Sequence, residues 1–368
     1  MDILIFNWKD LDHPEVGGAE VITFELARRL VRDGHHVTWF CQHVKNLPSE
    51  SVVSGIKIVR RGGTLSTYFC GYRYYRSLHK KPDLVIDMLN TLFWQTPLYV
   101  RGNVFAYVNQ LAQEVFFYEL PKWIAAVAYF LERFQFLSYR RTPFLCYSRS
   151  TQGDLTQVGI PLKNVRVFPM GLDHERYQPG EKASFPLFLC VSRLVRMKRV
   201  DLCIHAMQEL VRKHPQAKLC IMGYGYERKR LEKICHELSL NGNVYFHDQD
   251  VLFFEKNSRD QKVFLMQKAW ALLMPSAKEG WGMTVTESAA CGTPAIVSRV
   301  SGLIDSVVEG RTGIILSKNP TSKELCEAMS QIIEDVSFRE TLSKNAIEWS
   351  QNFEWEKSYQ NFKELIIQ

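Results

Sequence analysis

Short apolar runs alternate with longer amphipathic segments along nearly the whole chain of 368 residues. The run Ile3–Trp8 precedes a helical pattern that starts at Gly18. Its apolar positions share the spacing of one helix face: Ala19, Ile22, Leu26 and Leu30. Apolar strands alternating with helices predict parallel sheets covered by helices on both faces. The predicted fold class is therefore α/β, with doubly wound sheets.

The alternation is interrupted by the segment Tyr177–Pro186, which contains two prolines and a glycine and is typical of a linker. The length of the chain suits two domains. We expect residues 1–181 together with the C-terminal helix 353–368 to form one domain, and residues 182–352 to form the other. Ligands of such sheets bind beyond the carboxyl ends of the strands, so a cleft between the two domains is the expected site.

Composition excludes several classes of protein. A hydrophobic content of 46% and a charged content of 23% exclude wholesale disorder and collagen-like order. The net charge of +7 suits an anionic ligand or membrane face but does not by itself indicate DNA binding. The nine cysteines form no C-x-x-C pair, which predicts reduced core thiols in a cytosolic protein. We expect neither a signal peptide nor a membrane-spanning helix.

Glycines and basic residues follow several of the predicted strands. Gly17 and Gly18 precede the first helix, where glycines allow either close approach of an anion to backbone N–H groups or a tight turn. Arg193 and Lys198 follow the first strand of the second half, which suits a diphosphate; a solvated basic loop is the alternative. Gly223 begins a Gly-Tyr-Gly sequence after the next strand.

The stretch of residues 275–294 carries two glutamates among several glycines. Glu279 lies in a predicted loop, and Glu287 lies one to two turns into the helix that follows, so the two can contact different parts of one ligand. Carboxylates accept hydrogen bonds well from the hydroxyls of sugars and ribose. A buried structural pair of glutamates is the alternative interpretation.

Together these motifs resemble glycosyltransferase family 4, the glycogen-synthase-like group 1 transferases, which are retaining enzymes of GT-B fold. The resemblance rests on Glu279-x7-Glu287 within E-G-W-G-M-T-V-T-E, on Arg193 and Lys198, on Gly-x-Gly at Gly223, on A-C-G-T-P and on the early G-G-A-E. It covers nearly the whole chain and is more specific in the C-terminal part. It implies two Rossmann-like domains facing each other across a cleft, the first for the acceptor and the second for the nucleotide-sugar donor.

The resemblance also implies residue roles. The backbone of Gly17–Gly18 would contact the donor diphosphate, and Arg193 and Lys198 would neutralise it and the charge on the departing nucleotide. Glu287 would hold the ribose, and Glu279 the transferred sugar. Further donor-binding positions would be Gly223, Gly280, Trp281, Gly282, Met283 and Thr284. Such leaving-group catalysis by preorganised positive charge needs no metal and no cofactor.

The chain departs from the family pattern at Asn109, where relatives often carry a histidine close to the reacting sugar. Asparagine cannot act as a general base, although it can donate and accept hydrogen bonds. No side chain is a clear covalent nucleophile. The resemblance therefore favours displacement on one face of the sugar, with the acceptor hydroxyl losing its proton to the departing phosphate.

Two segments are rich in aromatic side chains. The Lys57–Lys81 region holds seven Lys or Arg and no acid, interleaved with aromatics. An anionic membrane surface suits it; single-stranded nucleic acid uses the same residue types, and a solvated helix with inward tyrosines is the third interpretation. We expect no nucleic-acid partner. The aromatic stripe in Val115–Arg141 fits helix core better than lipid contact, and it could instead shape an apolar acceptor site.

The sequence thus predicts a retaining, metal-independent hexosyltransferase of polysaccharide or glycolipid biosynthesis. Its donor would be a nucleotide diphosphate sugar, UDP-glucose first, and its acceptor a saccharide or lipid-linked saccharide. Base recognition in such folds is largely by backbone, so the side chains of residues 246–251 decide little. We expect the protein in the cytoplasm, with peripheral contact to the inner face of the plasma membrane as an open question. The alternative functions are a phosphorylase or a nucleotide-sugar epimerase on the same fold, and a non-catalytic nucleotide-sugar-binding protein.

Overall fold

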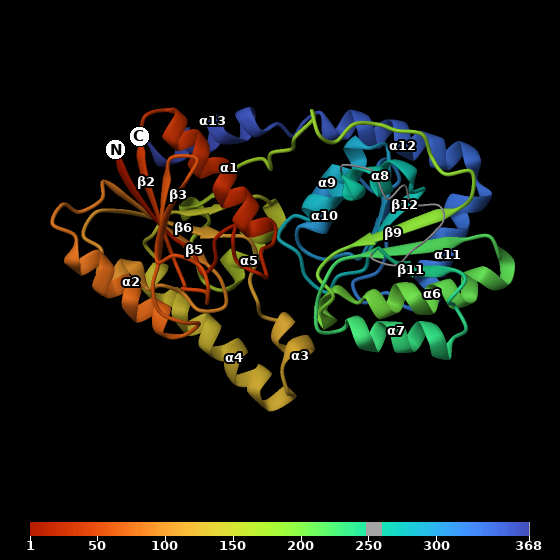
Figure 1. Ribbon diagram of the computed structural model, residues 1–368, viewed down its shortest axis with the longest axis horizontal. Coiled ribbons are helices and arrows are strands. Elements are labelled where there is room, and N and C mark those ends of the chain that lie inside the picture. The colour runs from red at the N-terminus through yellow and green to blue at the C-terminus, as the bar shows by residue number, and fades with distance from the viewer. Residues whose placement is uncertain (248–259, 368) are drawn as a thin grey trace. The chain divides into compact units, whose positions relative to one another are not determined.

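The computed structural model describes residues 1–247 and 260–367, so part of the 246–251 stretch lies outside the described residues (Figure 1). Its contacts divide the chain into two compact units. Unit 1 comprises Met1–Gln113, Trp123–Gly171 and Trp355–Gln368, and unit 2 comprises Glu114–Lys122 and Leu172–Glu354. Each unit is built around its own sheet, with helices on both faces (Figure 1).

Unit 1 contains an eight-stranded sheet of order β3-β4-β2-β1-β5-β6-β7-β8. Its strands are β1 (Asp2–Phe6), β2 (His36–Cys41), β3 (Glu50–Val53), β4 (Ile56–Arg60), β5 (Leu84–Leu89), β6 (Asn103–Val108), β7 (Phe144–Cys146) and β8 (Val165–Val167). Every pair is parallel except the β3–β4 hairpin. The helices assigned to this unit are α1 (Gly18–Arg32), α2 (Ser66–Ser77), α4 (Lys122–Gln135), α5 (Arg149–Gln157) and α13 (Trp355–Ile366), with short turns η1 (Thr96–Leu98), η2 (Phe136–Tyr139) and η3 (Leu162–Asn164).

Unit 2 contains a six-stranded, wholly parallel sheet of order β11-β10-β9-β12-β13-β14. Its strands are β9 (Leu187–Val191), β10 (Lys218–Met222), β11 (Val244–Phe246), β12 (Ala271–Met274), β13 (Ala295–Val297) and β14 (Gly313–Ile315). Its helical elements are α3 (Val115–Glu119), η4 (Arg196–Lys198), α6 (Val200–Lys213), α7 (Arg228–Glu237), α8 (Gln261–Lys268), α9 (Met283–Ala290), α10 (Leu303–Ser306), α11 (Ser322–Glu334) and α12 (Val336–Ser350).

The predicted doubly wound α/β fold is confirmed in both sheets. In each sheet the first strand lies near the centre. The strands that follow are added on one side of it, and the later strands on the other side. The reversal falls between β1 and β5 in unit 1, and between β9 and β12 in unit 2. Loops at such a switch point leave the carboxyl ends of the strands in opposite directions, which opens a crevice for a ligand. The central strands are apolar because both of their faces are covered: every residue of β5 is buried.

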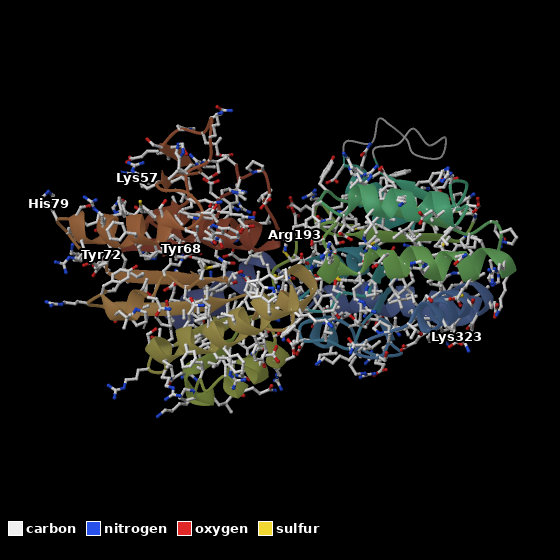
Figure 2. The ribbon with its side chains drawn as sticks, turned by 90° about the horizontal axis from the view of Figure 1, so that it is seen from below. Lys57, Tyr68, Tyr72, His79, Arg193 and Lys323 are labelled. Carbon is white, nitrogen blue, oxygen red and sulfur yellow. The ribbon has the colours of Figure 1, made fainter. Side chains whose placement is uncertain are left out.

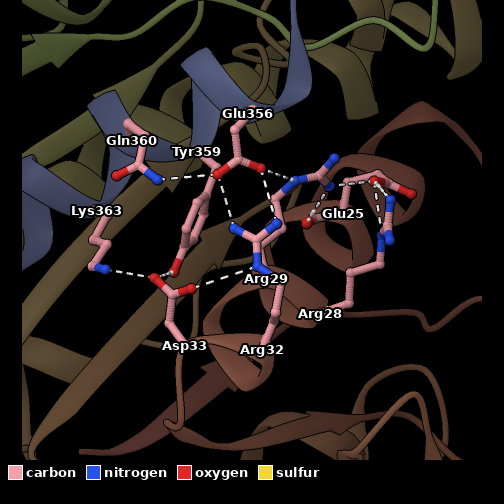
Figure 3. A network of polar contacts seen from close by, with 9 residues as sticks. All are labelled: Glu25, Arg28, Arg29, Arg32, Asp33, Glu356, Tyr359, Gln360 and Lys363. Carbon is pink, nitrogen blue, oxygen red and sulfur yellow. Dashed lines mark hydrogen bonds and ion pairs between the residues drawn. The ribbon is translucent and has the colours of Figure 1, made fainter.

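The C-terminal helix α13 packs against α1 within unit 1 (Figure 3). Arg32 of α1 forms two hydrogen bonds to Glu356, at 3.0 and 2.8 Å, and they lower the pKa of Glu356 to about 2. Asp33, at the end of α1, accepts hydrogen bonds from Tyr359 and Lys363, at 2.8 and 2.5 Å. Polar contacts at the rim thus fix how the apolar face of α13 packs on its unit.

A buried carboxyl group lies in the central strand of unit 1. The side chain of Asp87 in β5 is fully buried. Its Oδ2 accepts hydrogen bonds from the hydroxyls of Thr96 and Tyr139, at 2.6 and 2.5 Å, while its Oδ1 has no partner among the described residues. Burial raises the pKa of Asp87 to about 6, although the hydrogen bonds from Thr96 and Tyr139 oppose that rise.

This carboxyl group is expected to make stability depend on pH. The folded chain keeps a proton on Asp87 up to about pH 6, whereas the unfolded chain releases it near the ordinary value of 3.8. The contribution of Asp87 to the free energy of unfolding therefore falls as pH rises from about 4 to about 6, by about 3 kcal/mol. Urea titrations across this range should show that fall in the wild-type chain relative to Asp87→Asn. An identical pH dependence in the two proteins would contradict the assignment.

Candidate functional site

The carboxyl ends of β10, β9 and β12, three neighbouring strands of unit 2, carry most of the predicted site residues. The loop after β9 holds Arg193 and leads into η4, and the loop after β12 leads through Glu279 to α9. A backbone hydrogen bond of 2.8 Å from Ala277 to Met197 ties these two loops together. The reversal in strand order lies between β9 and β12, so this edge is where a doubly wound sheet binds ligands.

The glycines after β10 allow two loops to pack backbone against backbone. Gly223 has a φ of +148°, and a Cβ built on it would lie 1.8 Å from the carbonyl oxygen of Ser192. A Cβ on Gly225 would lie 2.2 Å from the carbonyl oxygen of Leu194. The amide of Leu194 in turn donates to the carbonyl of Tyr224 at 2.8 Å. The Gly-x-Gly sequence therefore holds the loop that carries Arg193.

Arg193 is exposed at the carboxyl end of β9 (Figure 2). Within the described parts of the chain, no acceptor contacts its guanidinium. The neighbouring Arg196 is also exposed, but its Nε lies 3.4 Å from a carboxylate oxygen of Glu227. Arginine presents a planar set of donors that matches phosphate and carboxylate oxygens. Arg193 is thus available to an anion without the loss of an internal ion pair.

The structure brings Lys198 and Glu279 together. The ammonium group of Lys198, in η4, forms an ion pair with the carboxylate of Glu279, and these side chains are only 11% and 12% exposed. Ser276 donates a hydrogen bond of 3.0 Å to the same carboxylate oxygen. The pair lies partly out of water, where an electrostatic interaction is stronger than at an open surface.

The loop Gly280–Gly282 leads into α9, and backbone packing shapes it. Gly282 has a φ of +84° and precedes the helix without a side-chain cap. A Cβ on Gly302 would lie 2.5 Å from the carbonyl carbon of Gly280, so the loop after β13 also presses on this turn. The first N–H groups of α9 therefore have no side-chain acceptor from the residue before the helix.

Two predicted donor-binding side chains near α9 have buried polar atoms without partners. The indole nitrogen of Trp281 and the hydroxyl of Thr284 make no hydrogen bond within the described residues. The ring of Trp281 packs edge-on against Phe353, with centroids 5.3 Å apart. Met283 begins α9 and is half-buried. The packing gives Trp281 a structural role in unit 2, whatever else its ring contacts.

Glu287 lies on α9 with both carboxylate oxygens engaged. Tyr177 donates a hydrogen bond of 2.9 Å to Oε1, and Lys262 of α8 contacts Oε2 at 2.5 Å. Burial and the charge of Glu287 raise the pKa of Tyr177 above its ordinary range. Neither Tyr177 nor Lys262 belongs to a recognisable motif, and the first lies in the segment interpreted as a linker, so the sequence analysis missed both.

In unit 1, the predicted anion site at the start of α1 contains a carboxylate of the chain itself. The backbone N–H of Gly17, the N-cap residue, donates to Oε2 of Glu20 at 2.8 Å, which is the backbone half of a capping box. Glu20 is buried, and its negative charge lies at the helix end that favours anions. The role predicted for Gly17 and Gly18 in diphosphate binding stays a prediction, and the helix cap is a competing role for the same backbone.

Asn109 follows β6 in unit 1 and is half-buried. Its side-chain nitrogen has no hydrogen-bond partner within the described ranges. The loop beyond it is fixed by Glu132 of α4, whose carboxylate accepts from the backbone N–H groups of Ala112 and Gln113, at 2.7 and 2.8 Å. Asn109 therefore lies at the start of a loop that the Glu132 carboxylate fixes in place, and its own side-chain N–H groups have no acceptor within the described residues. Whether it shares a ligand with the residues of unit 2 stays a prediction.

The structure changes the interpretation of the basic Lys57–Lys81 region. Four of its seven cations are paired with carboxylates from outside the region: Lys57 and Arg61 with Glu50, Arg60 with Asp10 and Asp12, and Lys80 with Asp2. Arg60 is also only 1% exposed and so contributes nothing to the surface. The region is less cationic at its surface than its sequence suggests.

The described residues contain no group of three or more His, Cys, Asp or Glu side chains that could hold a metal ion. Of the helices in residues 1–247 and 260–367, none is both long and apolar enough to cross a bilayer.

Comparisons with known families match both halves of the chain. Residues 16–176 match the family described as Glycosyltransferase Family 4, and residues 173–349 match the family described as Glycosyl transferases group 1. Among curated proteins, an uncharacterized glycosyltransferase of Methanocaldococcus jannaschii, MJ1607, is 25% identical over 381 residues, which cover 94% of this chain and 92% of the relative.

Solved structures share the architecture. Sucrose-phosphate synthase from Thermosynechococcus elongatus superimposes with a TM-score of 0.82 at 22% identity, over 99% of this chain and 98% of its own. HepE of Anabaena, in a complex with UDP-glucose, has a TM-score of 0.76 at 18% identity, over 99% of both chains. At these identities the likeness shows a common fold.

Proposed function

This chain belongs to glycosyltransferase family 4, the group 1 glycosyltransferases, and on that premise we propose that it transfers a hexose from a nucleotide diphosphate sugar to a saccharide acceptor with retention of configuration. Unit 2 would bind the donor and unit 1 the acceptor. UDP-glucose is the first donor to test, because the similar structure of HepE is a complex with UDP-glucose. The acceptor would be a free or a lipid-linked saccharide.

One observation carries the proposal: Arg193, whose guanidinium has no partner within the described residues, and Lys198, in a largely buried ion pair, lie on the same loop segment at the switch point of the unit 2 sheet. A diphosphate carries about two negative charges, and each charge-assisted hydrogen bond contributes about 1.5–3 kcal/mol. The N-terminus of α9, which begins after the uncapped turn at Gly282, adds the positive potential of a helix dipole.

The same charges would act on the reaction. In the proposed step the acceptor oxygen bonds to the anomeric carbon on the face from which the phosphate oxygen departs. The acceptor proton passes to that departing oxygen, and the nucleoside diphosphate leaves. Negative charge on the diphosphate grows as the bond to the sugar breaks, so Arg193 and Lys198 stabilise the transition state more than the bound donor.

The remaining polar groups suit the sugars at either end of the donor. We assign Glu279 to the hydroxyls of the transferred hexose, beside Lys198, and Glu287 to the ribose. For Glu287 this requires that the ribose hydroxyls replace, or add to, the present contacts with Tyr177 and Lys262. Asn109 would contribute a hydrogen bond from the acceptor side.

A thermal-shift panel of UDP, GDP, ADP and dTDP sugars tests the proposed donor class. A ligand present at 100 times its dissociation constant adds about 2.7 kcal/mol to the free energy of unfolding. We expect a clear rise in melting temperature with UDP-glucose and a smaller rise with the GDP, ADP and dTDP sugars. Stabilisation by none of the four would contradict donor binding. Conversion of the donor without an acceptor would instead indicate an epimerase, and binding without transfer to any saccharide a non-catalytic protein.

A further inference from the structure

Helix α4 presents an apolar face that no other described part of unit 1 covers. Its exposed apolar side chains, and that of the following turn η2, recur at the spacing of one helix face: Trp123, Val127, Phe130, Leu131, Phe134 and Leu137. Trp123, Phe130 and Phe134 are 73%, 62% and 65% exposed. The prediction of helix core for the aromatic stripe of Val115–Arg141 is therefore wrong for these exposed side chains, whereas Phe136 and Tyr139 of the same stripe are buried as predicted. Contiguous exposed apolar patches of this kind mark interaction surfaces.

The segment that carries this face has no exposed acid. Between residues 122 and 141 the only acid is Glu132, which is buried and whose carboxylate accepts from backbone N–H groups on the inner side of α4. The exposed charges in this segment are all positive: Lys122, Arg133, Arg140 and Arg141. Apolar side chains flanked by cations, with no exposed acid, are the pattern of a helix that lies in the interface of an anionic bilayer.

A second helix of unit 1, α2 (Ser66–Ser77), exposes side chains of the same kinds. In Figure 1, α2 and α4 both lie along the lower edge of unit 1. Helix α2 exposes Phe69 with 63% of its surface, and Leu65 just before it is 72% exposed. Arg73 and Arg76 of α2 have no carboxylate partner within the described residues, unlike most cations of the Lys57–Lys81 region. This helix therefore also combines apolar and unpaired basic groups.

We propose that α4 binds the surface of an anionic lipid bilayer, with its apolar face at the boundary between headgroups and acyl chains and its Lys and Arg side chains among the headgroups. The other obvious occupant is a second copy of this chain. A symmetric pairing of two such faces would bring Arg133 and its neighbours against their own like charges, which disfavours it. An anionic lipid surface neutralises those charges instead.

This docking would place the candidate acceptor region close to the membrane. The inner face of α4 holds, through Glu132, the loop that follows Asn109. A helix is about 10 Å in diameter, so a bilayer on the outer face of α4 lies roughly one helix away from that loop. This proximity favours an acceptor saccharide carried by a membrane lipid over a free saccharide; the inference rests on the proposed function.

The test is co-sedimentation of the full chain with vesicles, measured without donor or acceptor. We expect binding to vesicles of equimolar phosphatidylcholine and phosphatidylglycerol, little binding to phosphatidylcholine alone, and weaker binding as salt is raised. The double variant Phe130→Ser with Phe134→Ser should lose at least about tenfold in partition. Leu162→Ser, which removes an equally exposed apolar side chain of unit 1 outside α4, should bind like the wild type.

Wild-type protein that ignores anionic vesicles would overturn the proposal, and so would a double variant that binds as well as the wild type. Sedimentation equilibrium tests whether a second copy of the chain occupies this face instead. A dimer that the double variant abolishes would show that α4 is an interface between copies and would contradict the proposal. Melting temperatures with and without UDP-glucose, recorded for the same proteins, separate this result from the proposed function. Unchanged donor stabilisation with lost vesicle binding would support the membrane role of α4 alone.

Discussion

Replacement of Arg193 by alanine is expected to lower kcat by about a hundred- to a thousandfold, the usual effect of removing one preorganised donor from a developing negative charge. The guanidinium has no partner within the described residues, so its loss breaks no internal contact and the fold should be unaffected. The effect should therefore fall on the departing diphosphate. Steady-state kinetics with UDP-glucose, together with the melting temperature of the free protein, measure both parts of this expectation.

Arg196→Ala is the matched control, because Arg196 is also an exposed arginine of the same loop but has Glu227 as a partner. It should keep near-normal turnover. If Arg193→Ala also kept near-normal turnover, leaving-group stabilisation would be wrongly placed on this residue. Lys198→Ala should reduce turnover comparably, but it is a less clean test, since it leaves the buried carboxylate of Glu279 without its counter-ion.

Replacement of Glu287 by alanine is expected to weaken nucleotide binding by about ten- to a hundredfold, since a hydrogen bond to a charged group contributes about 1.5–3 kcal/mol. The ribose hydroxyls would lose their acceptor, while the groups near the anomeric carbon would stay in place. The dissociation constant of UDP should thus rise more than kcat falls. Isothermal titration calorimetry with UDP provides the measurement.

The structure supplies the controls for this variant. Glu287 also anchors Tyr177 and Lys262, so a loss of binding could follow from local disorder instead of a lost ribose contact. Tyr177→Phe and Lys262→Met remove those anchors but keep the carboxylate. We expect both to bind UDP within a few-fold of the wild type. Equal losses in all three variants would show that Glu287 acts through the packing of α8 and α9.

Features that depend on local pattern could be predicted from the sequence. Strand runs such as Leu187–Val191 are apolar throughout because both faces of the sheet are covered, and the following glycines are required where loop backbones approach within contact distance, as at Gly223. Both requirements decide the residue type at the position itself, so the sequence reveals them. The doubly wound fold follows from such signals, and so does the placement of Lys198 and Glu279 in segments that follow strands.

Features that depend on contacts between distant residues could not be predicted. The cations Lys57, Arg60 and Lys80 are neutralised by carboxylates between 7 and 78 positions away, so a local count overstates the surface charge. The aromatic stripe of α4 has the periodicity of a core helix, and periodicity alone does not say whether that face is covered. Tyr177 and Lys262 reach Glu287 only through the tertiary fold.

The most direct test of the central claim, that Arg193 and Lys198 bind the donor diphosphate, is a crystal structure of the protein with UDP. We expect phosphate oxygens within hydrogen-bond distance of the Arg193 guanidinium and the Lys198 ammonium group, with the ribose hydroxyls bound to Glu287. A nucleotide bound elsewhere, or at this edge with both cations turned into solvent, would contradict it.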